Sequence, residues 1–125
     1  MSELAWFMIK GEMGFLKDEK LGWKWLKKSA DAKHPEGMAG AGWCLVYGKG
    51  VEMNERHGLG LIGAAAGMHS GFGCYFMGDF YFHGACGFPM DKSEAKCWLD
   101  KAIENGSRNT VQIQKMLEEI GNQEA

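Results

Sequence analysis

The chain has 125 residues, of which 46% are hydrophobic and 24% are charged, a composition that excludes a disordered chain and fits one domain. The formal net charge is −2 and the basic residues form no block, so we expect no nucleic-acid surface. No apolar run reaches the ~18 residues of a membrane span, and the N-terminus lacks the pattern of a signal peptide. We therefore expect an intracellular, cytoplasmic protein whose four cysteines are free thiols.

Glycine is unusually frequent, with 19 residues against two prolines, and it recurs at a fixed interval. Asp18, Asn54 and Asp91 each begin a helix-like stretch, 36 and then 37 residues apart. Aspartate and asparagine are suited to cap the free amides at the start of a helix. A shared period of this length over three copies predicts stacked units of two helices each.

In chain order, the first unit covers about residues 1–33 and lacks most of its first helix. The second covers about 34–69 and the third about 70–106. An amphipathic helix over about 108–121 then covers the open end of the stack, as terminal units must for solubility. Glycine-rich segments between the helices predict tight turns. Glycines inside the helices, such as Gly42, Gly58 and Gly78, recur in register, so we expect them to let neighbouring helix backbones approach closely.

The third unit carries the clearest motif. It reads Met77-Gly78-x-x-Tyr81-x-x-Gly84, then Gly87-Phe88-Pro89-x-Asp91, Ala95, Trp98, Lys101-Ala102 and Gly106. This pattern resembles the Sel-1-like repeat, a relative of the tetratricopeptide repeat. The resemblance implies an all-α, right-handed solenoid of about three repeats whose first helices line a concave face. It also implies an adaptor or scaffold that binds other proteins, and it names no partner.

When the first helices are aligned on the recurrent glycine position, they share an apolar stripe beside the positions that we expect to form the core. Residues one, four and five positions after that point lie on one helix face. An exposed aromatic stripe with polar neighbours marks a partner site, so we predict that a protein partner, as a peptide or a helix, binds there. The predicted contacts are Trp6, Ile9, Lys10, Trp43, Val46, Tyr47, Asp79, Phe82 and His83. The same spacing also fits a thick hydrophobic core, and the residues alone leave both interpretations open.

Two further roles stay open. The chain fits an accessory structural subunit assembled permanently in a larger complex, and its incomplete N-terminal repeat fits self-association. We expect no enzyme and no cofactor, because neither a phosphate-binding loop nor a nucleophile elbow is present.

The cysteines and histidines offer the remaining chemistry. His83-x-x-Cys86 has a metal-like gap, but no second ligand pair stands at the spacing of a closed zinc site, so we expect no metal. Cys44, Cys74 and Cys97 read as small apolar residues in helices, whereas Cys86, in the inserted loop, is a candidate reactive thiol. Cysteine-rich relatives link helices within each repeat by a disulfide, and Ala66 stands where the partner of Cys74 would be, which argues against that subgroup.

Overall fold

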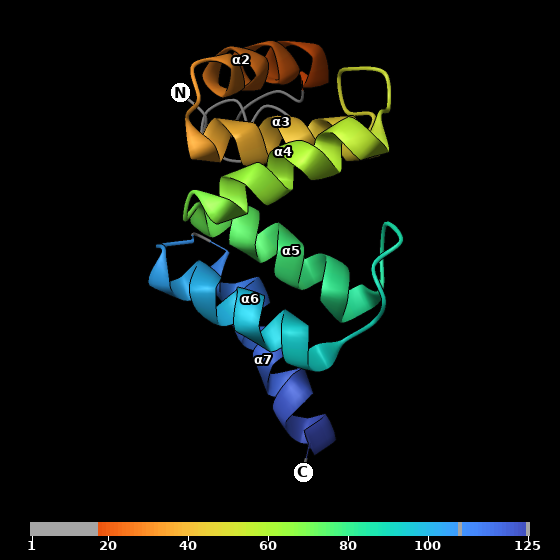
Figure 1. Cartoon of the computed structure of the whole chain (residues 1–125), viewed down its shortest axis with the longest axis vertical. Helices are drawn as coiled ribbons and strands as arrows, with labels where there is room; N and C mark the ends of the chain where they lie inside the picture. The colour runs from red at the N-terminus through yellow and green to blue at the C-terminus, as the bar shows by residue number, and fades with distance from the viewer. Residues whose placement is uncertain (1–17, 108, 125) are drawn as a thin grey trace.

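The computed structural model describes residues 18–107 and 109–124. Its helices are α2 (Glu19–Asp31), α3 (Pro35–Tyr47), α4 (Glu55–Gly67), α5 (Gly71–His83), α6 (Lys92–Glu104) and α7 (Thr110–Glu124). They stack one after another from α2 at one end to α7 at the other (Figure 1). The described residues contain no strand, which confirms the all-α solenoid. None of these helices is both long and apolar enough to cross a membrane.

The second helix of each repeat begins at the capping residue that the sequence predicts. A side-chain oxygen of Asp18, Asn54 and Asp91 accepts a hydrogen bond from the backbone N–H three residues further on, at 3.0, 3.2 and 3.1 Å. Each such cap contributes about 1 kcal/mol to helix stability. Three equivalent caps at the repeat period set the start of α2, α4 and α6.

The predicted glycine turns follow the first helices. Gly48 and Gly84 end α3 and α5 in the left-handed region, with φ of 66° and 65°. Gly50 and Gly87 also have positive φ, at 77° and 83°. The one-residue insertion of the third repeat lies in this second loop, where Cys86 has a φ of 56°. The loop therefore holds a cysteine in a backbone conformation that residues other than glycine rarely adopt.

The second helices end with a matching left-handed residue. Lys33, His69 and Gly106 occupy equivalent places and have φ of 65°, 65° and 75°. Only the third repeat has glycine there, although a left-handed backbone costs other residues about 1–2 kcal/mol. The first two repeats therefore store strain at this position.

Paired glycines bring α3 and α4 into backbone contact. A Cβ atom on Gly42 would lie 2.6 Å from the carbonyl oxygen of Gly58, and a Cβ on Gly58 would lie 2.5 Å from the carbonyl oxygen of Gly42. In the next repeat, a Cβ on Gly78 would lie 2.8 Å from the side chain of Leu99. No Cβ fits between Gly42 and Gly58, which confirms that these two glycines let helix backbones approach closely, whereas Gly78 makes room for a side chain.

Two core clusters run through the stack and share α5 and the end of α4, where Ala66 belongs to the second cluster. Phe80 of α5 packs with Ile62 of α4 in the first cluster. Phe82 of the same helix packs with Leu99 of α6 in the second. The contacts of α3 are equally many-sided, since α2, α4 and α5 all pack against it. These first helices are therefore apolar on nearly all sides rather than along one stripe.

Two tryptophans at equivalent positions of the first and third repeats lie at the edge of this core. Trp25 and Trp98 are half-buried and pack against the first and second cluster, respectively. Each ring also carries a lysine ammonium, Lys28 at 5.1 Å and Lys101 at 4.7 Å from the ring centroid. The tryptophans thus serve as covers that join the apolar core to the charged outer surface.

Helix α7 covers the last repeat, as the sequence predicts. Ile113, Met116 and Ile120 are buried in the second core cluster. Val111, which the amphipathic pattern also includes, is instead 62% exposed. The apolar face of α7 therefore begins at Ile113, two residues later than the sequence pattern indicates.

Candidate partner-binding surface

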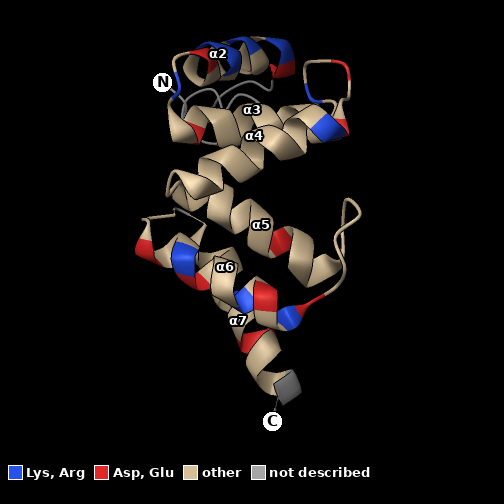
Figure 2. Cartoon of the chain, viewed as in Figure 1, with Lys and Arg blue, Asp and Glu red and all other residues tan. Residues whose placement is uncertain are grey.

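The predicted contacts of the second and third repeats lie on α3 and α5, which pack against each other. Charged residues are sparse on these two helices and more frequent on α2 and α6 (Figure 2). Trp6, Ile9 and Lys10, the predicted contacts of the first repeat, lie outside the described residues. The structure therefore locates six of the nine predicted residues.

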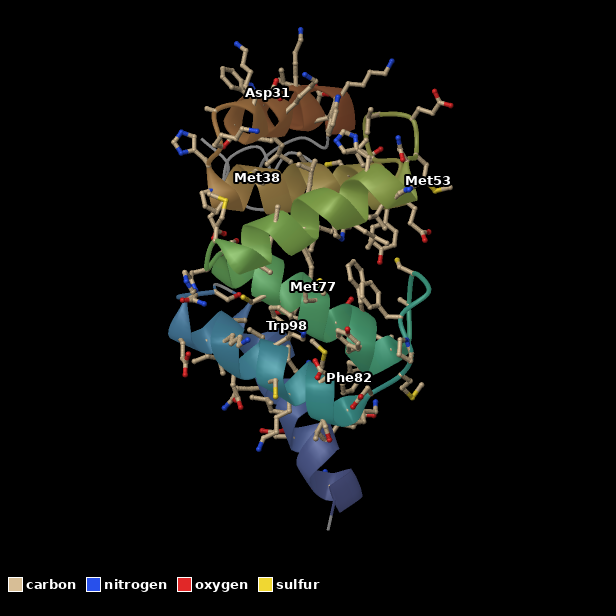
Figure 3. The ribbon with its side chains drawn as sticks, in the orientation of Figure 1. Asp31, Met38, Met53, Met77, Phe82 and Trp98 are labelled. Carbon is tan, nitrogen blue, oxygen red and sulfur yellow. The ribbon has the colours of Figure 1, made fainter. Side chains whose placement is uncertain are left out.

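Two of these six belong to the core. Val46 is 3% exposed and Phe82 is 5% exposed. Phe82, labelled in Figure 3, is also covered by Lys92, whose ammonium lies 3.5 Å from the centre of the ring and donates to the Phe82 carbonyl oxygen at 3.1 Å. Neither side chain is free to meet a partner, so for both the core interpretation holds.

The other two α3 residues reach the surface at the C-terminal end of the helix. Tyr47 is the last residue of α3 and is 43% exposed. Its ring centroid lies 5.1 Å from that of Trp43, and the two planes are tilted by 52°. Trp43 is half-buried and packs against the first core cluster. The Trp43 ring therefore packs between the exposed Tyr47 ring and the core.

Asp79 and His83 form a polar pair one turn apart on α5. Oδ1 of Asp79 lies 3.4 Å from Nε2 of His83, and the side chains are 29% and 57% exposed, respectively. Burial raises the pKa of Asp79 above its usual value, and the nearby His83 lowers it only in part. The neighbours of the Asp79 carboxylate therefore offset little of the cost of its burial.

Tyr75 and Cys86 complete this surface, although neither is among the predicted contacts. The Tyr47 hydroxyl donates a hydrogen bond to the sulfur of Cys86, and burial, followed by the charge of Cys86, raises the pKa of Tyr47 to about 12. Burial, together with the charge of Asp79, raises the pKa of Tyr75 to about 12. Tyr75 precedes Asp79 by four residues on α5, and this spacing is the sequence signal that identifies it.

We call this surface the α3–α5 face. It consists of Trp43, Tyr47, Tyr75, Asp79 and Cys86. Glu55, at the start of α4, adds a second carboxylate close enough to raise the pKa of both Tyr47 and Cys86. The face therefore combines aromatic rings, hydroxyl groups and negative charge.

The reactive-thiol hypothesis finds no support in this environment. Burial and the charge of Glu55 raise the pKa of Cys86, and the hydrogen bond from Tyr47 lowers it only in part. A thiol with a raised pKa stays protonated at neutral pH and is a weak nucleophile. Cys44 and Cys74 are buried as expected, whereas Cys97 is exposed, contrary to the interpretation as a packed residue. Among residues 18–107 and 109–124, no three histidine, cysteine or acidic side chains gather as a metal site.

Comparison with known proteins gives the family. The Sel1 repeat profile matches residues 1–34, 35–67 and 71–107. The crystal structure of a Sel1 repeat protein from Oxalobacter formigenes is similar with a TM-score of 0.66 and 28% identity, over 85% of this chain and 42% of that one. A protective antigen of uropathogenic Escherichia coli strains with an SLR fold has a TM-score of 0.61 and 29% identity, over 85% of this chain and 22% of that one.

The chain thus spans less than half the length of either of these solved structures. No curated protein matches it. Sel1 repeats are a type of protein-interaction module, and three matches cover most of the residues. This chain belongs to the Sel1 repeat family.

Proposed function

We propose that this chain is an adaptor or scaffold that binds a peptide segment or a helix of a partner protein on the concave side of the solenoid. The observation that best supports this function is the α3–α5 face, where aromatic side chains from two successive repeats meet and Tyr47 stays 43% exposed. Tyrosine and tryptophan dominate the binding energy of protein interfaces. A surface built by two repeats also offers the length that an extended segment needs.

The face has the parts of an interface in the expected arrangement. Trp43 gives a rigid apolar base under the Tyr47 ring. Asp79 and His83 form a polar edge beside it. Apolar anchors surrounded by polar groups are typical of interface centres and their rims. In this proposal the predicted residues Trp6, Ile9 and Lys10 extend the same surface into the first repeat.

The experiment that tests this function compares two exposed apolar residues. Tagged wild-type protein, Tyr47→Ser and Val111→Ser are used for affinity purification from the source cells, and a captured protein is then purified and titrated by calorimetry. Loss of an anchoring tyrosine weakens binding by about 2 kcal/mol, or roughly 30-fold. Val111 is more exposed than Tyr47 and lies on α7, so Val111→Ser should bind like the wild type. Circular dichroism checks that both variants keep their helices.

Other outcomes point elsewhere. A partner that binds Tyr47→Ser as tightly as the wild type would place the binding surface outside the α3–α5 face. A set of many subunits that co-purify equally with all three proteins would favour an accessory subunit of a larger complex. The intracellular location and the absence of an enzymatic role stay predictions.

A further inference from the structure

The α3–α5 face holds negative charge that its own neighbours do not balance. Asp79 is the single acidic residue of α5, and its side chain is 29% exposed. The basic side chain beside it is His83, at 3.4 Å, whose ring is 57% exposed and therefore lies largely in water. Contact with such an exposed group compensates little of the cost of removing a carboxylate from water.

Two tyrosines are influenced by this charge. The Asp79 charge contributes to the raised pKa of both Tyr75 and Tyr47, and Tyr47 contributes to that of Tyr75. The face of a tyrosine ring attracts a cation within about 6 Å of its centre. The same chain already places lysine ammonium groups over Trp25, Phe82 and Trp98, so this type of contact is used repeatedly in its architecture.

A second carboxylate extends the charge towards the neighbouring loop. Glu55 begins α4 and raises the pKa of both Tyr47 and Cys86, so Tyr47 is influenced by two acidic groups, Asp79 and Glu55. Neighbouring carboxylates on one surface repel an anionic ligand and attract a cationic one. The ligand that fits both the rings and the charges is therefore a flat or compact cation.

We propose that the α3–α5 face recognises a basic side chain of its partner, an arginine, with the guanidinium on the Tyr47 and Tyr75 rings and its charge towards Asp79 and Glu55. Arginine fits better than lysine because its planar group stacks on aromatic faces, is weakly hydrated and donates several hydrogen bonds at once. The inference rests on the proposed function and adds the chemistry of the partner segment: it is basic.

A titration with small probes tests this inference directly. N-acetyl-arginine methylamide is added to isotope-labelled protein, and the side-chain NMR signals of the aromatic residues are followed. N-acetyl-citrulline methylamide, which has nearly the same shape and no charge, is the control. We expect saturable shifts at Tyr47 and Tyr75 with the arginine probe and none with the citrulline probe.

Two aspartate variants locate the charge that is recognised. Asp79→Asn should weaken binding of the arginine probe about tenfold, which is typical for the loss of a charged hydrogen-bond partner. Asp100→Asn, a change at an exposed aspartate on α6, should leave the affinity unchanged. Equal shifts from both probes, no saturable shift from arginine, or equal affinities of the two variants would each overturn the inference.

The outcome is distinguishable from that of the proposed function. A partner whose binding depends on Tyr47 but is unaffected by Asp79→Asn would keep the proposed function and refute the basic side chain. Arginine binding that depends on Asp79, together with partner binding that is indifferent to Tyr47→Ser, would leave a cation site and refute the docking surface.

Discussion

Two glycine-to-alanine changes near the contact between α3 and α4 should have opposite effects on the free energy of unfolding. A Cβ on Gly42 would lie 2.6 Å from the Gly58 carbonyl oxygen and 2.7 Å from Cγ1 of Ile62. One of these neighbours is backbone and cannot rotate away, so the two helices must separate. Overpacking of this kind costs about 1–3 kcal/mol, while alanine gains up to about 1 kcal/mol in helix propensity. We expect Gly42→Ala to lower the free energy of unfolding by about 1–2 kcal/mol.

Gly60 is the matched control, because it lies in α4 but away from the contact. It also lies inside a helix, α4, but a Cβ there would meet no atom within 4 Å. Only the propensity difference then applies, and Gly60→Ala should raise the free energy of unfolding by about 0.5–1 kcal/mol. The same chemical change is thus expected to act with opposite sign at two positions 18 residues apart.

Urea unfolding followed by circular dichroism measures both effects, and a shifted midpoint at an unchanged slope reports a change in stability alone. For a domain of this size each kcal/mol corresponds to about 3–6 °C in melting temperature. If Gly42→Ala proves as stable as Gly60→Ala, the helix backbones are further apart than described, and the register of the repeats is wrong.

Three further measurements address other positions. His69→Gly replaces a residue with a left-handed backbone by glycine, which adopts that conformation without strain, and should raise the free energy of unfolding by about 0.5–1 kcal/mol. An unchanged melting temperature would contradict the strain at this turn. Burial raises the pKa of Asp79 in the folded protein, so wild-type stability should fall as pH rises from below 3.8 through that raised pKa. Asp79→Asn should lack this fall in a pH series of melting curves, and parallel curves would refute the assignment. Cys97 is exposed and Cys86 is half-buried with a raised pKa, so a thiol reagent with mass-spectrometric mapping should modify Cys97 first, and faster reaction of Cys86 would restore the reactive-thiol hypothesis.

The repeat architecture could be predicted because each of its determinants is local. A capping aspartate or a turn glycine acts on atoms a few residues away, and a period of 36 or 37 residues repeats that action. Asn54 shows this well, since its side chain bonds to the amide of His57. Such features need no knowledge of which helices meet in space.

The exposure of the predicted stripe could not be read from the sequence in the same way. Helical spacing shows that Val46 and Tyr47 stand close together on α3, but not which neighbours cover them. Val46 packs within a cluster built by several helices, while Tyr47 lies where α3 ends. Tyr75 lies outside the predicted stripe because it precedes the recurrent glycine Gly78, and the stripe contains only positions that follow it. The half-burial of Cys86 depends on a loop that turns back towards α3, a long-range contact that no local pattern shows.

The sharing of α4 and α5 between the two core clusters has a consequence for motion. Unfolding from the C-terminal end removes the second cluster but leaves Phe80 packed with Ile62 in the first. Helices that belong to both clusters open only when both are lost, so amide hydrogens should exchange fastest in α7 and slowest in α4 and α5. The slowest part of the solenoid then carries Tyr75 and Asp79. A partner would meet a surface that is already ordered, and its binding would spend little free energy on stiffening the protein.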